Sequence, residues 1–292
     1  LPQNTVYALA QTGDGCLWIG SEGGLARFDG FTFAVFNRSN TLAMMNNSVT
    51  SLCPDRDGSL WIGSFGGGLL NFRAGKFARV PGLGSDFIWS IRQDSAGSLW
   101  VVTADNGIYC LEKGEAPALV IAGGLPDQRI TAMAEDHRGG IWIGTRRGLV
   151  SIINGKKKLF NSQSGLAGDY VYCLFADSRK CMWVGTTTGL SRIDDRGIRN
   201  FTVRDGLADD LVRAIGEDRL GRKWIGTDKG LTIMERGDPA ACFTPGSLAG
   251  NSVMAVCRDR EDNMWVGTSA SGLSFLKKNE VRIVGADDGL PG

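Results

Sequence analysis

The sequence has few of the residues that support catalysis or metal binding. One of its 292 residues is a histidine, His137, and its seven cysteines form no Cys-x-x-Cys pair and no cluster with histidine. Histidine is the commonest metal ligand and a frequent general base, and zinc sites need closely spaced cysteine or histidine side chains. We therefore predict no metal, no cofactor and no histidine-based chemistry. Cys53, Cys173 and Cys257 lie in short apolar runs, where a free thiol packs as a small hydrophobic group.

An excess of one charge and a long apolar run are also missing. The 32 lysines and arginines are matched by 31 aspartates and glutamates, for a net charge of +1. This balance excludes the strong basic field of a nucleic-acid-binding protein. No run approaches the ~18–20 apolar residues that a membrane span needs. We therefore predict no nucleic-acid partner and no membrane span in this stretch of chain.

Glycine is abundant instead, and much of it belongs to an internal repeat. The chain has 42 glycines, about twice the usual share of ~7%. Seven of the eight tryptophans sit in one motif, such as Ser-Leu-Trp-Ile-Gly around Trp61, at spacings of 39 to 43 residues. An aspartate stands six residues before the tryptophan in six copies, and a serine or threonine stands three residues after it in all seven. Because these residues recur in nearly every copy, we interpret them as scaffold, with the aspartate capping the turn that follows it.

Each copy predicts four short antiparallel strands. In the second copy these are residues 47–55, 59–64, 69–75 and 76–80, with Asp57-Gly58 and Gly66 to Gly68 at the turns between them. A four-stranded unit of this size buries both its faces only when neighbouring units cover it, which stacking around an axis achieves. We predict an all-β fold, a single seven-bladed β-propeller of four-stranded antiparallel blades over residues 1–292. The blades are expected to start near residues 4, 47, 86, 128, 169, 210 and 251.

The two ends of the sequence indicate how the ring closes. Leu1 and Leu290 occupy equivalent positions in a Gly-Leu linker that recurs before the first strands. The chain therefore makes one full turn, and each blade is a continuous stretch. We expect no strand to be exchanged between the first and last blades, so that closure depends on packing between them.

The repeat resembles a known family. The pattern V-x-x-L, then D-x-x-G-x-L-W-I-G-T, then G-L and an aromatic strand is similar to the two-component regulator propeller repeat, in all seven copies. The third copy departs from it, with Val101-Val102 in place of Ile/Val-Gly. The resemblance implies a periplasmic, extracytoplasmic sensor region of a bacterial receptor. Its histidine kinase or diguanylate cyclase would lie outside this stretch.

Positions that differ between the copies are free of the demands of the shared fold and can specialise. They lie at the start of each first strand and in the loop between the second and third strands, which we expect on one face over the central channel. Binding residues concentrate on loops held by a rigid scaffold. We predict a ligand site there, in which aromatic rings stack on the ligand and charged groups bind its polar atoms. Its residues are Phe87, Trp89, Asp105, Arg129, Arg146, Arg147, Tyr170 and Tyr172.

These features favour a non-catalytic sensor domain that binds a small molecule or an oligosaccharide. The alternative is a platform for protein–protein interaction, such as a receptor dimer partner. A propeller lyase or hydrolase fits less well, because lyases that resemble this fold use histidines at the channel mouth. An acid or amide also stands two residues before each first strand. We favour turn capping for these side chains, against a ring of acceptors for sugar hydroxyls or cations.

Overall fold

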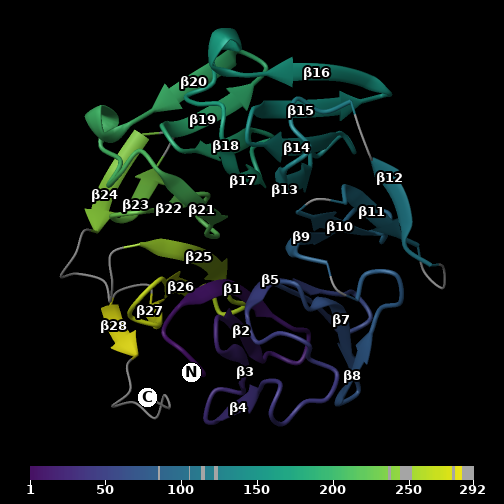
Figure 1. The fold of residues 1–292 in the computed structure, drawn as a ribbon. Coiled ribbons are helices and arrows are strands. Elements are labelled where there is room, and N and C mark those ends of the chain that lie inside the picture. The colour runs from purple at the N-terminus through teal and green to yellow at the C-terminus, as the bar shows by residue number, and fades with distance from the viewer. Residues whose placement is uncertain are drawn as a thin grey trace.

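In the computed structural model the described residues are 1–84, 86–104, 106–112, 116–121, 124–235, 238–243, 252–277 and 280–284, with backbone only for 238–243 and 280–284. They form seven four-stranded antiparallel sheets, each built from four strands consecutive in sequence. Figure 1 shows the sheets arranged as blades around a central axis. The predicted seven-bladed β-propeller is confirmed.

The four strands of each blade run outward from the axis in sequence order. The innermost strands are β1 (Val6–Gln11), β5 (Val49–Pro54), β9 (Ile88–Gln93), β13 (Ile130–Glu135), β17 (Val171–Ala176), β21 (Val212–Glu217) and β25 (Val253–Arg258). The second strands, which carry the repeated tryptophans, are β2 (Leu17–Ser21), β6 (Leu60–Ser64), β10 (Leu99–Thr103), β14 (Ile141–Thr145), β18 (Met182–Thr186), β22 (Lys223–Thr227) and β26 (Met264–Thr268).

The outer half of each blade is completed by two further strands. The third strands are β3 (Gly24–Phe28), β7 (Gly68–Arg73), β11 (Ile108–Leu111), β15 (Gly148–Ile153), β19 (Gly189–Asp194), β23 (Gly230–Glu235) and β27 (Leu273–Lys277). The outermost strands are β4 (Phe33–Phe36), β8 (Lys76–Arg79), β12 (Ala118–Ile121), β16 (Lys156–Phe160), β20 (Gly197–Phe201), β24 (Asp238–Phe243) and β28 (Glu280–Val284). Two linkers between blades contain a short 3-10 turn. The turn η1 (Ser162–Ser164) precedes β17, and η2 (Val203–Asp205) precedes β21.

The repeated polar residues hold each blade together, as the sequence predicts. The indole N–H of every motif tryptophan donates to the side chain six residues earlier, an aspartate or Thr12, at 2.8–3.0 Å. In blade 4 the second oxygen of Asp136 accepts the backbone N–H groups of Arg138 and Gly140 and so caps the turn. The hydroxyl three residues after each tryptophan donates to a carbonyl at the start of the third strand, at 2.8–3.2 Å.

The hydrophobic core is divided among the contacts between blades. Seven clusters of buried side chains occur in the described residues, and each joins two neighbouring blades. Glycine in the second strand permits this close packing. A Cβ added at Gly144 would lie 2.5 Å from the Cγ1 of Val171 in the next blade, well inside van der Waals contact.

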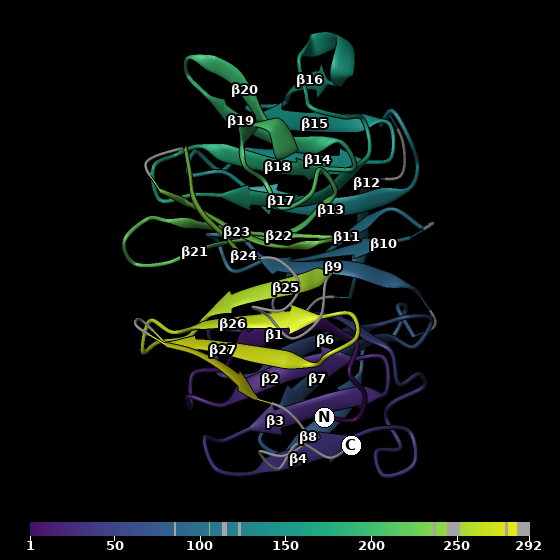
Figure 2. The same ribbon diagram turned by 90° about the vertical axis from the view of Figure 1, so that its left-hand side faces the viewer.

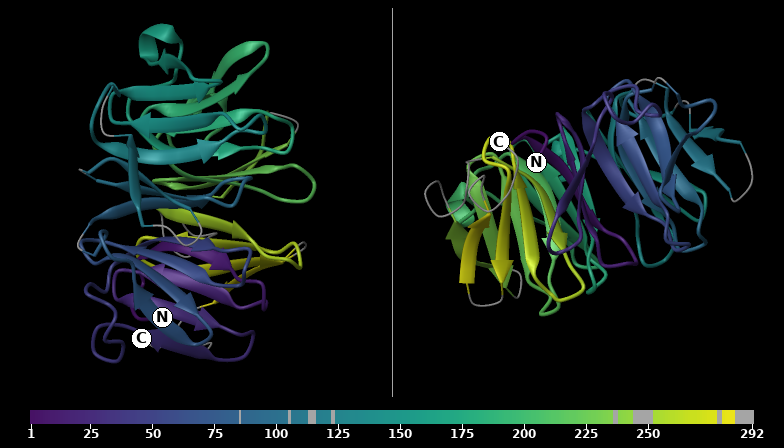
Figure 3. Two further views of the ribbon diagram at one scale, coloured as in Figure 1. Left: turned by 90° about the vertical axis from the view of Figure 1, so that its right-hand side faces the viewer. Right: turned by 90° about the horizontal axis from the view of Figure 1, so that it is seen from below.

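The first and seventh blades meet directly. Leu1, Val6 and Leu273 share one core cluster, and Figure 2 shows β25 to β27 beside β1 to β3. In the right-hand panel of Figure 3 the first blade lies between the seventh and the second. Among the described residues no strand is exchanged between the first and last blades, as expected. Over the same residues, no helix has the length and apolar character that crossing a bilayer demands.

Candidate functional site at the central channel

Every inner strand carries a β-bulge near its start. In all seven blades the pairing with the second strand skips one residue, so that the bulged residue has no partner opposite it. A bulge bends the strand and turns a side chain in a new direction. The bulged residues are Tyr7, Thr50, Trp89, Thr131, Tyr172, Arg213 and Met254.

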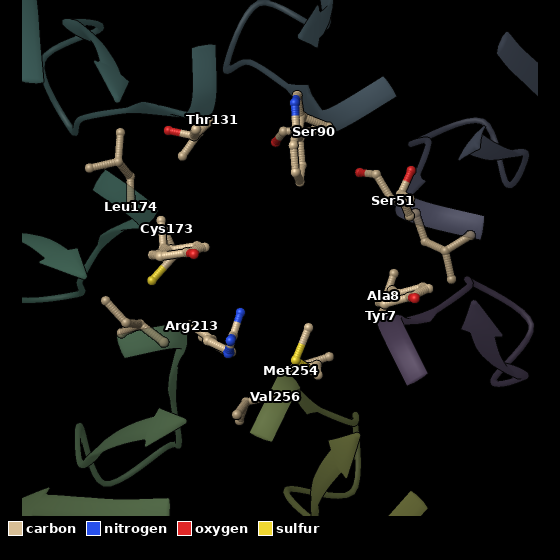
Figure 4. A pocket seen from close by; sticks show the side chains of 18 of the residues that line it. Tyr7, Ala8, Ser51, Ser90, Thr131, Cys173, Leu174, Arg213, Met254 and Val256 are labelled. Carbon is tan, nitrogen blue, oxygen red and sulfur yellow. The ribbon is translucent and has the colours of Figure 1, made fainter. Parts of the chain in front are cut away.

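These seven residues line an axial cavity of about 200 Å³. Figure 4 shows side chains from all seven blades around it, with Arg213 pointing toward the axis. We call the end of this cavity where the inner strands begin the upper mouth. The loops between second and third strands lie at the same end, because their backbone N–H groups bond to the linkers, as from Phe65 to Ser48 and from Thr187 to Tyr170. As the sequence predicted, these loops and the starts of the inner strands lie on one face of the propeller.

One side of the upper mouth is a stack of three aromatic rings. The rings of Phe87 and Trp89 stack with centroids 4.5 Å apart and an interplanar angle of 27°. Phe65, from the loop of the preceding blade, packs on Phe87 at 4.1 Å and is 51% exposed. Trp89 lines the axial cavity, so the stack extends from the exposed rim to the cavity wall.

A second stack, formed by tyrosines, lies two blades away. Tyr170 and Tyr172 stack at 4.6 Å and 21°. The guanidinium of Arg146 lies 5.5 Å from the Tyr170 ring and that of Arg213 lies 5.3 Å from the Tyr172 ring. Burial and the neighbouring Tyr172 raise the pKa of Tyr170, although Arg146 opposes the shift. The Tyr170 hydroxyl is therefore protonated at neutral pH and can donate a hydrogen bond.

Arg213 is held in place by groups from three blades. Its Nε and Nη2 atoms both lie 2.9 Å from Oδ1 of Asp228. The hydroxyl of Ser252, in the next blade, donates to the same oxygen at 2.9 Å. With Tyr172 on its other side, the guanidinium is oriented before any ligand arrives, which lowers the entropic cost of binding.

The structure divides the predicted site residues into groups. Trp89 and Tyr172 line the axial cavity, with Phe87 and Tyr170 stacked behind them. Arg129 and Arg147 instead line a separate cavity of about 490 Å³ with Asp127, which lies 3.8 Å from Arg147. Asp105 lies outside the described residues.

Sequence reasoning passed over Tyr7 and Arg213 as site residues, although both line the axial cavity. Both hold the bulge position that Trp89 and Tyr172 hold in their own blades. The signal that could have found them was the variation at this position across all seven copies. An inner-strand arginine, Arg92, also lines the cavity and was missed.

Three of the acids and amides that precede the inner strands accept backbone N–H groups of the linker before them. Oδ1 of Asp169 accepts the backbone N–H of Ser162, and Oδ1 of Asp210 accepts that of Val203. Asn47 accepts the N–H of Arg38 in the same way. These contacts support turn capping for these three residues. The last member of the series, Asn251, lies outside the described residues.

The thiols and the histidine have ordinary surroundings. Burial raises the pKa of the Cys173 thiol to about 12, and burial together with Asp259 raises that of Cys257 to about 11. Both are therefore protonated and weakly nucleophilic at neutral pH. His137 is exposed in the turn between β13 and β14, at the end of the blade opposite the upper mouth. In the described part of the chain, no group of three or more His, Cys, Asp or Glu side chains is placed to hold a metal ion.

Solved structures with the same fold include receptor domains and an enzyme. The extracellular domain of a putative hybrid two-component system from B. thetaiotaomicron is 22% identical, with a TM-score of 0.86 over 96% of this chain and 40% of that one. The extracellular domain of a putative one-component system from the same organism is 23% identical, with a TM-score of 0.77 over 95% and 39%. This chain thus spans about 40% of the length of these two structures. Virginiamycin B lyase from Staphylococcus aureus is 14% identical, with a TM-score of 0.73 over 91% and 92%.

Comparison of the sequence with protein families gives a more specific result. No protein of curated function matches the chain. The family described as "Two component regulator propeller" matches residues 1–23, 43–66, 82–105, 124–147, 165–188 and 247–270. Each of these ranges contains the inner strand and the second strand of one blade, in blades 1 to 5 and 7. The chain belongs to the family of two component regulator propellers.

Proposed function

We propose that this propeller is a non-catalytic, ligand-binding sensor domain of a bacterial receptor. It would lie outside the cytoplasm, in the periplasm, and signal to a kinase or cyclase elsewhere in the receptor. The family supports this proposal, as do the two extracellular receptor domains that share the fold. The observation that carries it is the ring of seven bulged residues, one from each blade, which brings five kinds of side chain to one channel mouth.

The chemistry of the upper mouth favours a small polar ligand with a ring, such as a sugar or one end of an oligosaccharide. Trp89 and Tyr172 offer flat apolar surfaces, and the fixed Arg213 and the tyrosine hydroxyls offer hydrogen-bond donors. A cavity of about 200 Å³ is below the ~300–1,000 Å³ typical of sites that enclose drug-sized ligands. The ligand would therefore insert one ring and leave the remainder on the exposed rim near Phe65.

A thermal-shift screen of neutral and uronate-containing mono- and oligosaccharides at millimolar concentration tests the proposal. A ligand that binds the folded state alone raises the unfolding temperature. For the best ligand, calorimetry on Trp89→Ala and Tyr172→Ala is expected to show affinity at least about tenfold weaker, since a lost aromatic contact costs on the order of 1 kcal/mol or more.

Phe31→Ala is the matched control, because Phe31 is an aromatic residue 93% exposed in the turn between β3 and β4, away from the upper mouth. It should bind like the parent protein. Absence of any stabilising sugar, or equal affinities in all variants, would contradict the proposal.

One observation favours the alternative of a protein-interaction platform. Phe65 is 51% exposed beside Phe87, and Leu42 and Met45 in the linker of the first blade are also exposed. Exposed apolar groups of this kind mark interaction surfaces when they are contiguous. Light scattering across protein concentration would show self-association, and Phe65→Ser should abolish it if this surface is used.

A further inference from the structure

A second cavity opens at the end of the channel where the inner strands finish, which we call the lower mouth. It has a volume of about 500 Å³ and four arginines line it: Arg92, Arg219, Arg258 and Arg260. They come from blades 3, 6 and 7. Leu9, Leu52 and Pro54 contribute apolar surface to the same cavity.

Comparison of the seven copies shows that two of these arginines are not part of the scaffold. The residues at the position of Arg92 in the other copies are Ala10, Cys53, Ala134, Phe175, Gly216 and Cys257. Those at the position of Arg258 are Gln11, Pro54, Gln93, Glu135, Ala176 and Glu217. None is basic, so the fold itself requires neither arginine.

The other two arginines connect neighbouring blades. Arg219 Nη2 donates to the carbonyl of Arg260 at 2.7 Å, and Arg260 Nη1 donates to the carbonyl of Gly13 at 2.6 Å. Bonds to carbonyls leave the positive charge uncompensated. The nearest carboxylate contact of Arg219 is to Asp262, at 3.9 Å.

The cavity therefore concentrates positive charge in a protein that is nearly neutral overall. Asp259 is the acid in its lining, and its carboxylate already accepts from the Trp265 indole and from Asn263. Within the described residues, Arg92 and Arg258 are exposed and form no ion pair; Arg92 donates to the carbonyl of Ile91 at 3.3 Å. The guanidinium groups of Arg92 and Arg258 therefore line the cavity with N–H donors that are available to a ligand.

We propose that the lower mouth binds a small organic molecule that carries an oxoanion, a carboxylate, sulfate or phosphate group. Arginine presents a planar fork of N–H donors that matches the geometry of these anions. Arg92 and Arg258 bind the anion, Arg219 and Arg260 add to the positive potential, and Leu9, Leu52 and Pro54 contact the apolar part of the molecule. Arg92 also lines the axial cavity, so this site adjoins the channel from the side opposite the upper mouth.

The test is calorimetric titration with sulfate, phosphate and citrate, each at constant ionic strength. The parent protein should bind at least one of them saturably. The double variant Arg92→Gln/Arg258→Gln should bind it about tenfold or more weakly, because each lost contact is a charge-assisted hydrogen bond. Circular dichroism establishes that the variant is folded, and the single variant Arg258→Gln serves if the double variant is not.

Arg138→Gln is the matched control, because Arg138 is an exposed arginine in the turn between β13 and β14 and does not line the cavity. It should retain the parent affinity, as should Trp89→Ala at the upper mouth. An equal loss in Arg138→Gln would mean diffuse attraction and would overturn the proposal. Absence of saturable binding of all three anions would overturn it as well.

Discussion

Lys223 stands where the other six copies have an apolar residue. The equivalent residues are Leu17, Leu60, Leu99, Ile141, Met182 and Met264. The Lys223 side chain is 5% exposed, and its Nζ lies 2.9 Å from Oε1 of Glu217 and 3.1 Å from Oδ2 of Asp177. It therefore joins blades 5 and 6 through a buried ionic cluster instead of an apolar contact.

The cluster affects how stability depends on pH. Burial disfavours the charged forms of Asp177 and Glu217, but hydrogen bonds from Trp183 and Ser178 and the charge of Lys223 outweigh it and lower both pKa values. A carboxyl whose pKa is lower in the folded state adds stability above its unfolded pKa of roughly 4, and this stability is lost as the pH falls through the folded pKa. Acid should therefore loosen the interface between blades 5 and 6.

Lys223→Met is expected to weaken this pH-dependent contribution. Without the ammonium group the two pKa values rise toward their ordinary range, so the loss of stability on acidification begins at a higher pH. At pH 7 we expect a loss of about 1–3 kcal/mol, since the remaining hydrogen bonds still hold both carboxylates. Urea unfolding between pH 3 and pH 7 measures both effects. Met182→Leu at the same position is the control, and a variant profile parallel to that of the parent would refute the assignment.

At the scale of elements, the inner strand combines a constant and a variable part. Its first residue, such as Val6 or Val171, is fully buried between blades in every copy, while the bulged residue that follows turns into the channel. The bulge thus lets one strand serve packing and binding at adjacent positions. This explains why neighbouring residues in the sequence show opposite degrees of variation.

The residue two positions after the motif tryptophan, in the second strand, packs against the inner strand of the next blade, so its size must fit that contact. A Cβ on Gly226 would lie 2.6 Å from Cγ1 of Val253. Blade 3 has Val102 at this position, and Val102 is buried in a cluster with Ile130 and Ile143 of blade 4. The departure in the third copy is therefore accommodated by different packing.

Exchanging these residues should destabilise the protein in both directions. Gly226→Val overpacks the interface between blades 6 and 7, at a cost of about 1–3 kcal/mol. Val102→Gly leaves a cavity between blades 3 and 4, at a similar or larger cost. Urea unfolding at pH 7 measures each change. A stabilising effect of Val102→Gly would contradict this interpretation, because it would show that the packing of Val102 against blade 4 is unfavourable.

At the scale of the whole molecule, the ring is closed without an exchanged strand. The contacts between the seventh and first blades include Thr5 Oγ1 to the carbonyl of Ser269 at 2.8 Å and Gly272 N to the carbonyl of Asn4 at 2.9 Å. Arg260 adds bonds to Gln11 and Gly13. These resemble the contacts at other blade pairs, as between Gly68 and Asp86, but no linker joins these two blades within the ring.

Opening of the ring is therefore expected between the seventh and first blades. Arg260→Ala should increase hydrogen exchange in β1 and β25, because nothing covalent holds these strands together when their contacts weaken. Arg56→Ala is the matched control: Arg56 bonds to the carbonyls of Asp94 and Ser95, but a linker holds its two blades. Equal protection of β1 and β25 in both variants would contradict this account of closure.

Much of the fold could be predicted from the sequence because each blade repeats the same local chemistry. The motif around Trp61 indicated the strand order, and the ends of the expected strands of the second copy lie within about two residues of those of β5 to β8. The candidate site was harder. Trp89 and Tyr172 were identified at the channel, whereas Arg129 and Arg147 lie at another cavity, because the reach of each loop is set by its own contacts and not by its place in the repeat.

The sequence by itself determined the number of blades, their strand order and the residues that hold each blade together. These features depend on contacts between residues of the same repeat, which is about 41 residues long, and the same pattern recurs in all seven copies. Only the tertiary structure decided which side chains meet across the axis, such as the arginines of the lower mouth and the group around Arg213. Those residues are far apart in sequence and come together only when seven separate blades close into a ring.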